Sequence, residues 1–327
     1  MPDIEVVPAL SADAQGVLRD TISYRSSDNR SLLVGYLWHA PALEARGVLH
    51  IIHGMCEFIE RYDDFARFLA LNGYIVVGHD LLAHGDSVAS GQERGQLEPG
   101  RSARILIEDE ERLREAMASR YPDLPYVMLG HSMGSLILRN YLQDYVDGLS
   151  GAIFCGTTWV FSKFELKAAQ LLSSVLCKLR GPQAKSLILD RLVLGAYARH
   201  FKGEGPYAWL SQDKEIQERY AQEPRNQMRF SLGAYHELFF LIARSQEERL
   251  ISRMTKSLPI FIISGDKDPV GTEGKAASML NEILLRLGFK DVRLTLYAGK
   301  RHELLNECGK EEVYQDILAW MERRYEL

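Results

Sequence analysis

Short apolar segments alternate with helical patterns along most of this chain, and this alternation limits the possible folds more than any other feature. Residues 48–52, 126–129 and 260–263 are compact apolar runs with few polar side chains. Strands that are covered on both faces have this composition. Parallel strands also need crossover segments, which the helical patterns between the runs supply. The sequence therefore predicts an α/β protein with a mostly parallel central sheet flanked by helices.

The remaining elements follow from the same patterns. Residues 18–25 and 31–38 surround the turn at residues 27–30 and predict an antiparallel hairpin at the start of the sheet. Further core strands are predicted at residues 74–78, 152–155 and 293–297. Apolar residues at three-and-four spacing predict the helices, which we place at residues 62–72, 103–120, 136–145, 275–287 and 311–324.

One long segment between the fourth and fifth parallel strands has no clear core strand. It shows helical pattern instead, broken at Gly181 and Pro182, at residues 203–206 and at Pro224. We therefore expect residues 1–157 and 254–327 to form the α/β core. Residues 158–253 are expected to form a helical cap inserted into it.

Composition and charge exclude several classes of function. The net charge of −5 leaves no basic stripe for nucleic acid. No apolar run is long enough to cross a bilayer, and the first residues lack the basic and apolar regions of a signal peptide. The four cysteines form no CxxC pair, which favours reduced thiols. A cytoplasmic location is therefore expected, while the oligomeric state is left open.

A GxSxG motif lies where an apolar strand passes into a helical pattern. Gly130, His131, Ser132, Met133 and Gly134 form it. A serine in this context sits on a tight strand-to-helix turn, the nucleophile elbow, and glycines leave room for the neighbouring chain. The motif predicts Ser132 as a catalytic nucleophile.

A second loop follows the earlier strand that ends near residue 52. A tetrahedral intermediate needs two backbone N–H donors, one after the nucleophile and one from such a loop. We assign these donors to Met133 and Met55. His53 is expected to brace the loop by hydrogen bonds, and Cys56 to take no part in the chemistry.

The acid and the base are expected late in the chain. Asp266 and Asp268 follow one predicted core strand, and His302 follows the next. The chain order serine, aspartate, histidine is that of the α/β-hydrolase triad. The histidine would take the serine proton, and one of the two carboxylates would orient it. Position alone leaves open which aspartate does so.

The segments HGMCEFIERYDDFARFLALNGYIVVGHDLLAHGDS, GHSMGS, GDKDPVG and YAGKRHELLNE carry a family resemblance. The chain resembles the monoacylglycerol lipase and lysophospholipase group of α/β-hydrolases, most closely its bacterial members. This resemblance implies the α/β-hydrolase fold with a cap, and it makes Asp268 the acid. The sequence departs from the usual Gly-Glu-His at residues 56–58 and from the usual Gly-His-Gly at residues 83–85.

The expected activity is that of a serine carboxylic ester hydrolase. Its substrate would be a single-acyl lipid ester, monoacylglycerol or lysophospholipid, cleaved through an acyl-enzyme on Ser132. No cofactor and no metal ion are expected, because the sequence shows no ligand spacing such as HExxH. Three alternatives stay open: a short-chain carboxylesterase, an enzyme of the aminopeptidase or proline iminopeptidase type, and a noncatalytic binding protein of the same fold.

An apolar stripe in the cap region has more than one interpretation. Its residues recur at helical spacing and are Trp159, Phe161, Phe164, Ala168, Leu172, Val175 and Leu179. The simpler expectation is that the stripe packs against its own domain. The alternatives are a wall of an acyl channel and a lipid-facing surface, through which the cap would contact a membrane transiently.

Overall fold

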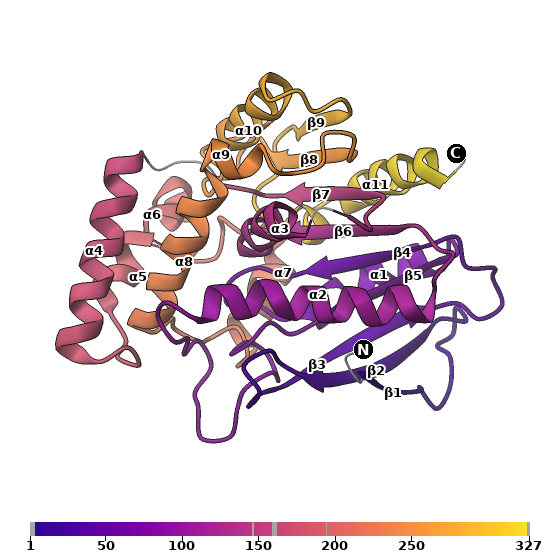
Figure 1. Ribbon diagram of the computed structural model, residues 1–327, viewed down its shortest axis with the longest axis horizontal. Coiled ribbons are helices and arrows are strands. Elements are labelled where there is room, and N and C mark those ends of the chain that lie inside the picture. Colours follow the sequence, from indigo (N-terminus) through magenta and orange to yellow (C-terminus); the bar gives the residue numbers. More distant parts are fainter. Residues whose placement is uncertain (1–3, 146, 159–161, 194, 326–327) are drawn as a thin grey trace.

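The computed structural model describes residues 4–145, 147–158, 162–193 and 195–325. Within them, a nine-stranded sheet forms the centre of the molecule, with the strand order β1-β2-β3-β5-β4-β6-β7-β8-β9 (Figure 1). The strands β1 to β3 pair antiparallel with their neighbours, and all pairs from β5 to β9 are parallel. The bounds are β1 Ile4–Val7, β2 Leu18–Arg25, β3 Leu32–His39, β4 Gly47–Ile52, β5 Tyr74–His79, β6 Tyr126–His131, β7 Gly151–Cys155, β8 Ile260–Gly265 and β9 Val292–Tyr297.

Alternate side chains of the central strands pack into two separate hydrophobic cores, one on each side of the sheet. On β4, Val48 and Ile52 pack on one side of the sheet, while Leu49 and Ile51 pack on the other. The first side is covered by α2 (Ser102–Arg120), α3 (Met133–Asp144) and α10 (Lys275–Arg286). The second is covered by α1 (Asp63–Ala70) and α11 (Lys310–Tyr325). The predicted mostly parallel α/β sheet is thus confirmed.

In the described residues between β7 and β8, the regular elements are helices, apart from an isolated bridge between Lys185 and Ser231. Helix α8 (Leu232–Ser245) of this segment lies against α3. From α3, Arg139 donates to the Ser245 carbonyl at 2.6 Å and Asn140 donates to the Leu241 carbonyl at 3.0 Å. The segment therefore packs on the layer that covers the sheet, and the cap at residues 158–253 stays a prediction. Its elements are α4 Lys163–Arg180, α5 Leu187–Val193, α6 Gly195–Ala198, η2 Arg199–Phe201, α7 Lys214–Gln222, α8 Leu232–Ser245 and α9 Glu248–Ile251.

The apolar stripe of α4 faces solvent, so the expectation that it packs inside its domain is wrong for the described residues. Phe164 is 81% exposed and Leu179 is 76% exposed. Helix α4 instead turns Leu166 and Ser173 toward the protein, and it packs on α8. Helical spacing identifies one face of a helix, but it does not reveal what covers that face. Trp159 and Phe161 lie outside the described residues.

Two shorter elements complete the description, η1 at Ile59–Tyr62 and η3 at Leu304–Asn306. Both follow loops at the carboxyl ends of parallel strands, where ligand sites of open α/β sheets lie. In the part of the chain described, no helix combines the length and the apolar character needed to cross a bilayer.

Candidate active site

Ser132 sits at the turn between β6 and α3 with a strained backbone. Its φ of 52° and ψ of −117° lie outside the regions that side chains with a Cβ normally adopt. The flanking glycines make this turn possible. A Cβ at Gly134 would lie 2.1 Å from the Ile52 carbonyl oxygen, and one at Gly130 would lie 2.4 Å from the Gly134 oxygen. The local structure is therefore that of a nucleophile elbow.

The predicted base and acid form a buried pair at the ends of β8 and β9. His302 Nδ1 lies 2.9 Å from Asp268 Oδ2, and the two residues are 2% and 0% exposed. Asp268 Oδ1 also accepts from the Val270 N–H at 2.9 Å. Because the carboxylate can only accept, Nδ1 carries the proton and Nε2 is left free for another group.

Asp266 lies apart from this pair. Its Oδ1 accepts from the Gly299 N–H at 2.7 Å, in an exposed bond that holds the β9 loop. Of the two aspartates between which position could not decide, the structure therefore brings Asp268 to the histidine. Asp266 serves the turn, as the family resemblance implies.

Ser132 and His302 open on one cavity of about 410 Å³ beneath the helical segment. Met55 and Met133, the predicted oxyanion donors, also line it. The walls are mostly apolar and come from α3, α5, α8 and the loop after β8; they include Leu136, Val193, Leu238, Phe239, Ile242 and Val270. An apolar cavity with a few convergent polar groups is the usual form of a small-molecule site.

The loop after β4 lies directly against the nucleophile. A Cβ at Gly54 would stand 3.0 Å from Ser132 Cβ, so Met55 follows at the edge of the reaction site. Met133 is the first residue of α3, where backbone N–H groups have no partner within the helix. This placement suits two donors to one oxyanion, although their role stays a prediction.

A buried ionic network, which the sequence patterns did not predict, joins the loops around the site. The Glu57 carboxylate accepts from the Gly54 N–H and lies 3.0 Å from His131 Nδ1 in the elbow. Arg61 bridges Glu57 to Glu303, the neighbour of His302, at 2.8 and 2.6 Å. The network therefore ties the oxyanion loop, the elbow and the histidine loop together.

Electrostatics in this network favour the charged forms. The His131 and Arg61 partners hold the pKa of Glu57 well below its usual range, despite its burial. Glu57 in turn raises the pKa of His131. No sequence pattern indicates the pairing of Arg61 with Glu303, because 242 positions separate them.

His53 and Cys56 behave as expected. His53 Nε2 accepts from the Leu81 N–H at 2.9 Å, so that its Nδ1 donates to the Gly54 carbonyl at 2.8 Å. The prediction that His53 braces the loop is confirmed. Burial raises the pKa of the Cys56 thiol to about 12, which removes the reactive thiolate at neutral pH.

The parallel sheet, the elbow and the buried histidine and aspartate define the α/β-hydrolase fold class. The chain belongs to the family described as serine aminopeptidase, S33, whose model matches residues 43–309. It is an enzyme of the serine ester hydrolase type.

Named relatives extend over most of the chain. A monoacylglycerol lipase from Mycolicibacterium smegmatis is 28% identical over 86% of this chain and 90% of its own length. The human monoglyceride lipase is 25% identical over 91% of this chain and 89% of its own length. Among solved structures, a carboxyl esterase from Bacillus coagulans in complex with glycerol is 27% identical. It covers 93% of this chain and 98% of its own, with a TM-score of 0.86.

Proposed function

We propose that this enzyme hydrolyses single-acyl lipid esters, with monoacylglycerols as its main substrate class. One observation carries the proposal: Ser132 and His302, which is paired with the buried Asp268, line the same cavity, and the walls of this cavity are mostly apolar. An acyl chain can occupy such walls, while a small head group stays near the polar end. The names of the relatives support the same substrate class.

The proposed mechanism is acyl transfer through Ser132. His302 Nε2 accepts the serine proton as Oγ attacks the ester carbonyl, and Asp268 stabilises the imidazolium that forms. The N–H groups of Met55 and Met133 bind the developing oxyanion. His302 then returns the proton to the leaving alcohol. In the second half of the reaction, His302 takes a proton from a water molecule whose oxygen attacks the acyl-enzyme carbonyl. His302 then returns this proton to Ser132 Oγ as the fatty acid is released. No cofactor or metal ion takes part.

The peptidase alternative needs an acidic anchor for a substrate amine. Three acids of the segment between β7 and β8 have other partners: Glu204 pairs with Arg301, while Asp213 and Glu165 cap α7 and α4. The acids that do line the cavity, Glu57 and Glu303, are both bound by Arg61. These contacts favour an ester substrate over an aminoacyl one.

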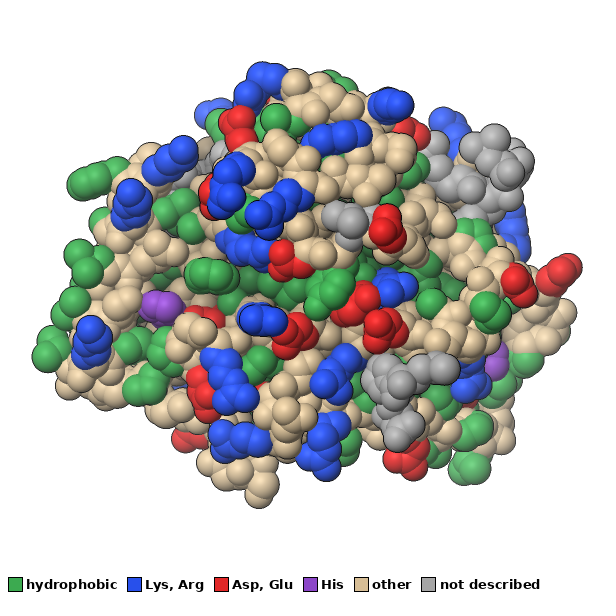
Figure 2. Space-filling model, in the orientation of Figure 1, with side chains coloured by type: hydrophobic (Ala, Val, Ile, Leu, Met, Phe, Trp, Pro, Cys, Tyr) green, Lys and Arg blue, Asp and Glu red, His purple; other side chains and the backbone are tan. Residues whose placement is uncertain are grey.

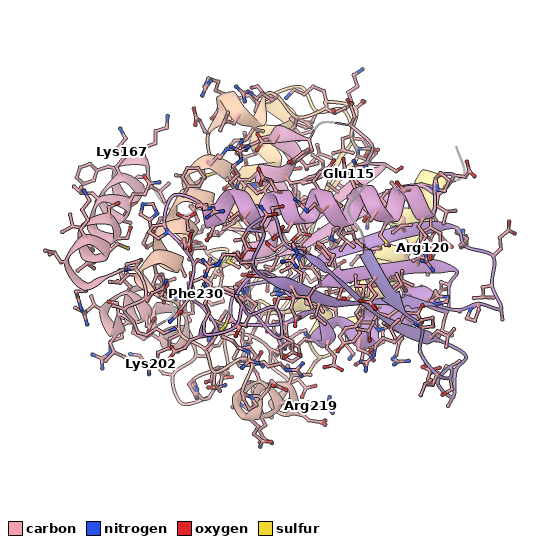
Figure 3. The ribbon with its side chains drawn as sticks, turned by 60° about the horizontal axis from the view of Figure 1, so that its bottom comes forward. Glu115, Arg120, Lys167, Lys202, Arg219 and Phe230 are labelled. Carbon is pink, nitrogen blue, oxygen red and sulfur yellow. The ribbon has the colours of Figure 1, made fainter. Side chains whose placement is uncertain are left out.

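We also propose that α4 brings the enzyme to an anionic lipid surface. The exposed face of α4 and α5 carries Phe164, Leu171, Leu172, Val175, Leu179, Leu187 and Ile188. Figure 2 shows hydrophobic side chains along the left edge of the molecule, where α4 lies. The basic residues Lys163, Lys167 and Lys178 are on the same helix, and Lys167 extends away from the body of the protein (Figure 3). This combination fits an interfacial helix.

We propose a cytoplasmic location from the cysteine pattern. The four free thiols, at Cys56, Cys155, Cys177 and Cys308, agree with a reducing compartment. The acyl ester would be a small-molecule substrate met at a membrane surface, which needs no spanning segment.

A substrate panel tests the proposed function. The panel contains p-nitrophenyl esters, monoacylglycerols, lysophosphatidylcholine and aminoacyl amides, and kcat/KM is measured for each. We expect monoacylglycerols to be preferred and aminoacyl amides to be inert. A fluorophosphonate probe should label the wild type and Cys56→Ser but not Ser132→Ala. Preference for aminoacyl amides would support the peptidase alternative, and absence of both labelling and turnover would support a noncatalytic protein.

A further inference from the structure

Three polar side chains meet inside the core, away from the proposed active site. His50 lies on β4, His79 on β5 and Glu110 on α2, and their exposed fractions are 0%, 1% and 0%. Helix α2, marked in Figure 3 by Glu115 and Arg120, lies over the strands and closes the cluster from solvent. None of the three lines the catalytic cavity. The proposed mechanism uses none of them.

The facing atoms of the three residues converge without forming hydrogen bonds to one another. His50 Nε2 is 2.8 Å from Glu110 Oε2, and His79 Nε2 is 3.6 Å from Glu110 Oε1. Among the described residues, none of these four atoms has a partner with hydrogen-bond geometry. One ligand atom from each residue lies within 4.8 Å of the other two. Buried polar atoms without hydrogen bonds are rare, so these four atoms need a physical explanation.

The outer nitrogens of both rings are held by tyrosine hydroxyls. Tyr24 Oη donates to the Asp109 carbonyl at 3.1 Å and therefore accepts from His79 Nδ1, also at 3.1 Å. This bond leaves His79 Nε2 unprotonated, at 3.6 Å from Glu110 Oε1. Tyr126 Oη lies 3.1 Å from His50 Nδ1. Metal-bound histidines have this type of partner on the second nitrogen, which fixes the ring and its tautomer.

We propose that His50, His79 and Glu110 bind a divalent transition-metal ion, with zinc as the best match to the donors. Two imidazoles and one carboxylate are a common zinc set, at Zn–N and Zn–O distances of about 2.0–2.2 Å. Two ligands of one such ion stand about 3 Å apart. Each imidazole has a different Glu110 oxygen near this distance, His50 Nε2 at 2.8 Å from Oε2 and His79 Nε2 at 3.6 Å from Oε1. If the Nε2 atoms of His50 and His79 point at a bound ion rather than at the Glu110 oxygens, the missing hydrogen bonds are also explained.

The local charges suit a dication. Glu110 supplies one negative charge as a ligand. The neighbouring buried Asp109 accepts from Ser26 Oγ at 2.7 Å and from the Ser27 N–H at 2.6 Å. Burial raises the pKa of its carboxyl to about 7, so it would supply the second negative charge when it ionises beside a bound cation. Together they offset the two positive charges of the ion, as a buried charge requires. The ion would complete its coordination with a water molecule.

The role that follows is structural. The ion joins two adjacent strands to the helix above them, and β4 leads directly into the loop that carries His53, Gly54 and Met55. Stabilising the end of β4 would hold this loop in place without any contact with substrate. Because the cluster is closed from solvent, the ion must enter during folding, and a chelator would not reach it in the folded enzyme.

Metal content after refolding tests the proposal. The untagged full-length protein is unfolded in denaturant with a chelator, then refolded with or without stoichiometric Zn²⁺, and bound metal is measured by mass spectrometry. We expect one zinc per chain and a Tm at least about 5 °C above that of the metal-free protein. Refolding with Co²⁺ should give an intense visible absorption, which is expected for an ion with only four nitrogen and oxygen ligands.

Substitutions of the cluster residues test whether the ion is bound at this position. Glu110→Gln and His79→Gln should each lose the bound zinc and the Co²⁺ absorption. His39→Gln, a matched change of a histidine that pairs with Asp20 outside the cluster, should keep both. Wild-type protein that refolds with less than about 0.1 ion per chain and an unchanged Tm overturns the proposal. That result would assign the cluster to a proton shared by Glu110 and the imidazoles. Full zinc content in both cluster variants overturns it as well. If the variants fail to fold, the wild-type stoichiometry decides.

Discussion

Three residues at the end of β6 and the start of α3 create the conformation of the proposed nucleophile. Ser132 occupies a strained conformation that only the bare backbones of Gly130 and Gly134 can accommodate. Strain of this kind persists where the surrounding structure over-determines it, which happens mostly at functional sites. The strain projects the Ser132 side chain into the cavity that His302 also lines.

The first prediction separates the two aspartates after β8. Asp268→Asn should lower kcat by about 10⁴, because the amide favours the wrong tautomer of His302. Asp266→Asn should lower it by less than about 10-fold, since Asp266 only holds the Gly299 N–H. Steady-state kinetics with p-nitrophenyl butyrate measure both, and melting curves control for folding. A larger loss with Asp266→Asn would mean that the acid is misassigned.

The second prediction concerns Glu57 and pH. Its pKa lies well below the ordinary value in the folded protein, so its ionised form stabilises the fold above about pH 4.3. That contribution is lost as pH falls below this value toward the folded pKa. Glu57→Gln should therefore cost about 3 kcal/mol of unfolding free energy near pH 6, and the difference from wild type should shrink toward pH 3.5. Denaturant unfolding at several pH values measures this. A difference that stays constant across that range would contradict the prediction.

At the scale of elements, the positions of strands were easier to predict than which face of a helix is buried. Most core strands are compact apolar runs, and their predicted positions agree with β4 to β9 within two residues. The strand β1 was missed because Ile4–Val7 is short, lies at the edge and has a mixed burial pattern. Helix α3 begins at Met133, before the predicted residue 136, because the elbow itself starts the helix.

Helix α4 carries the third prediction. Phe164→Ser and Leu171→Ser should each weaken binding to vesicles of anionic phospholipid, by about 3-fold or more, since each removes exposed apolar area from the proposed interface. Hydrolysis of a water-soluble ester should not change. Met279→Ser, an equivalent change on the exposed surface of α10, should leave vesicle binding unaltered. Co-sedimentation with vesicles measures binding. Equal binding by all variants would remove α4 from the interface.

At the scale of the whole molecule, sequence motifs predicted the chain order of Ser132, Asp268 and His302 but not the networks between distant segments. Glu57, Arg61 and Glu303 come from two loops that meet only after the sheet has formed. His50, His79 and Glu110 come from two strands and a helix, with no short ligand motif. Spacing rules describe contacts within one element, whereas these contacts depend on how the elements pack.

The cavity gives the fourth prediction. A buried methylene contributes about 0.8 kcal/mol, so kcat/KM should rise severalfold for each two-carbon extension of the acyl chain until the cavity is full. Leu238→Ala, in the cavity wall, should flatten this dependence. Leu241→Ala, buried on the same helix outside the wall, should lower Tm without changing the profile. Kinetics with esters of two to sixteen carbons measure both variants. A wild-type profile that peaks at acetyl would favour a short-chain esterase.

The most direct test of the central claim is the release of glycerol from 1-monooleoylglycerol by wild type and by Ser132→Ala, with folding checked by melting temperature. The account predicts steady turnover by the wild type and a loss of at least about 10⁴-fold in kcat for the variant, because triad members act as a unit. Turnover that survives in a folded Ser132→Ala protein, or a wild type that leaves the monoacylglycerol intact, would contradict it.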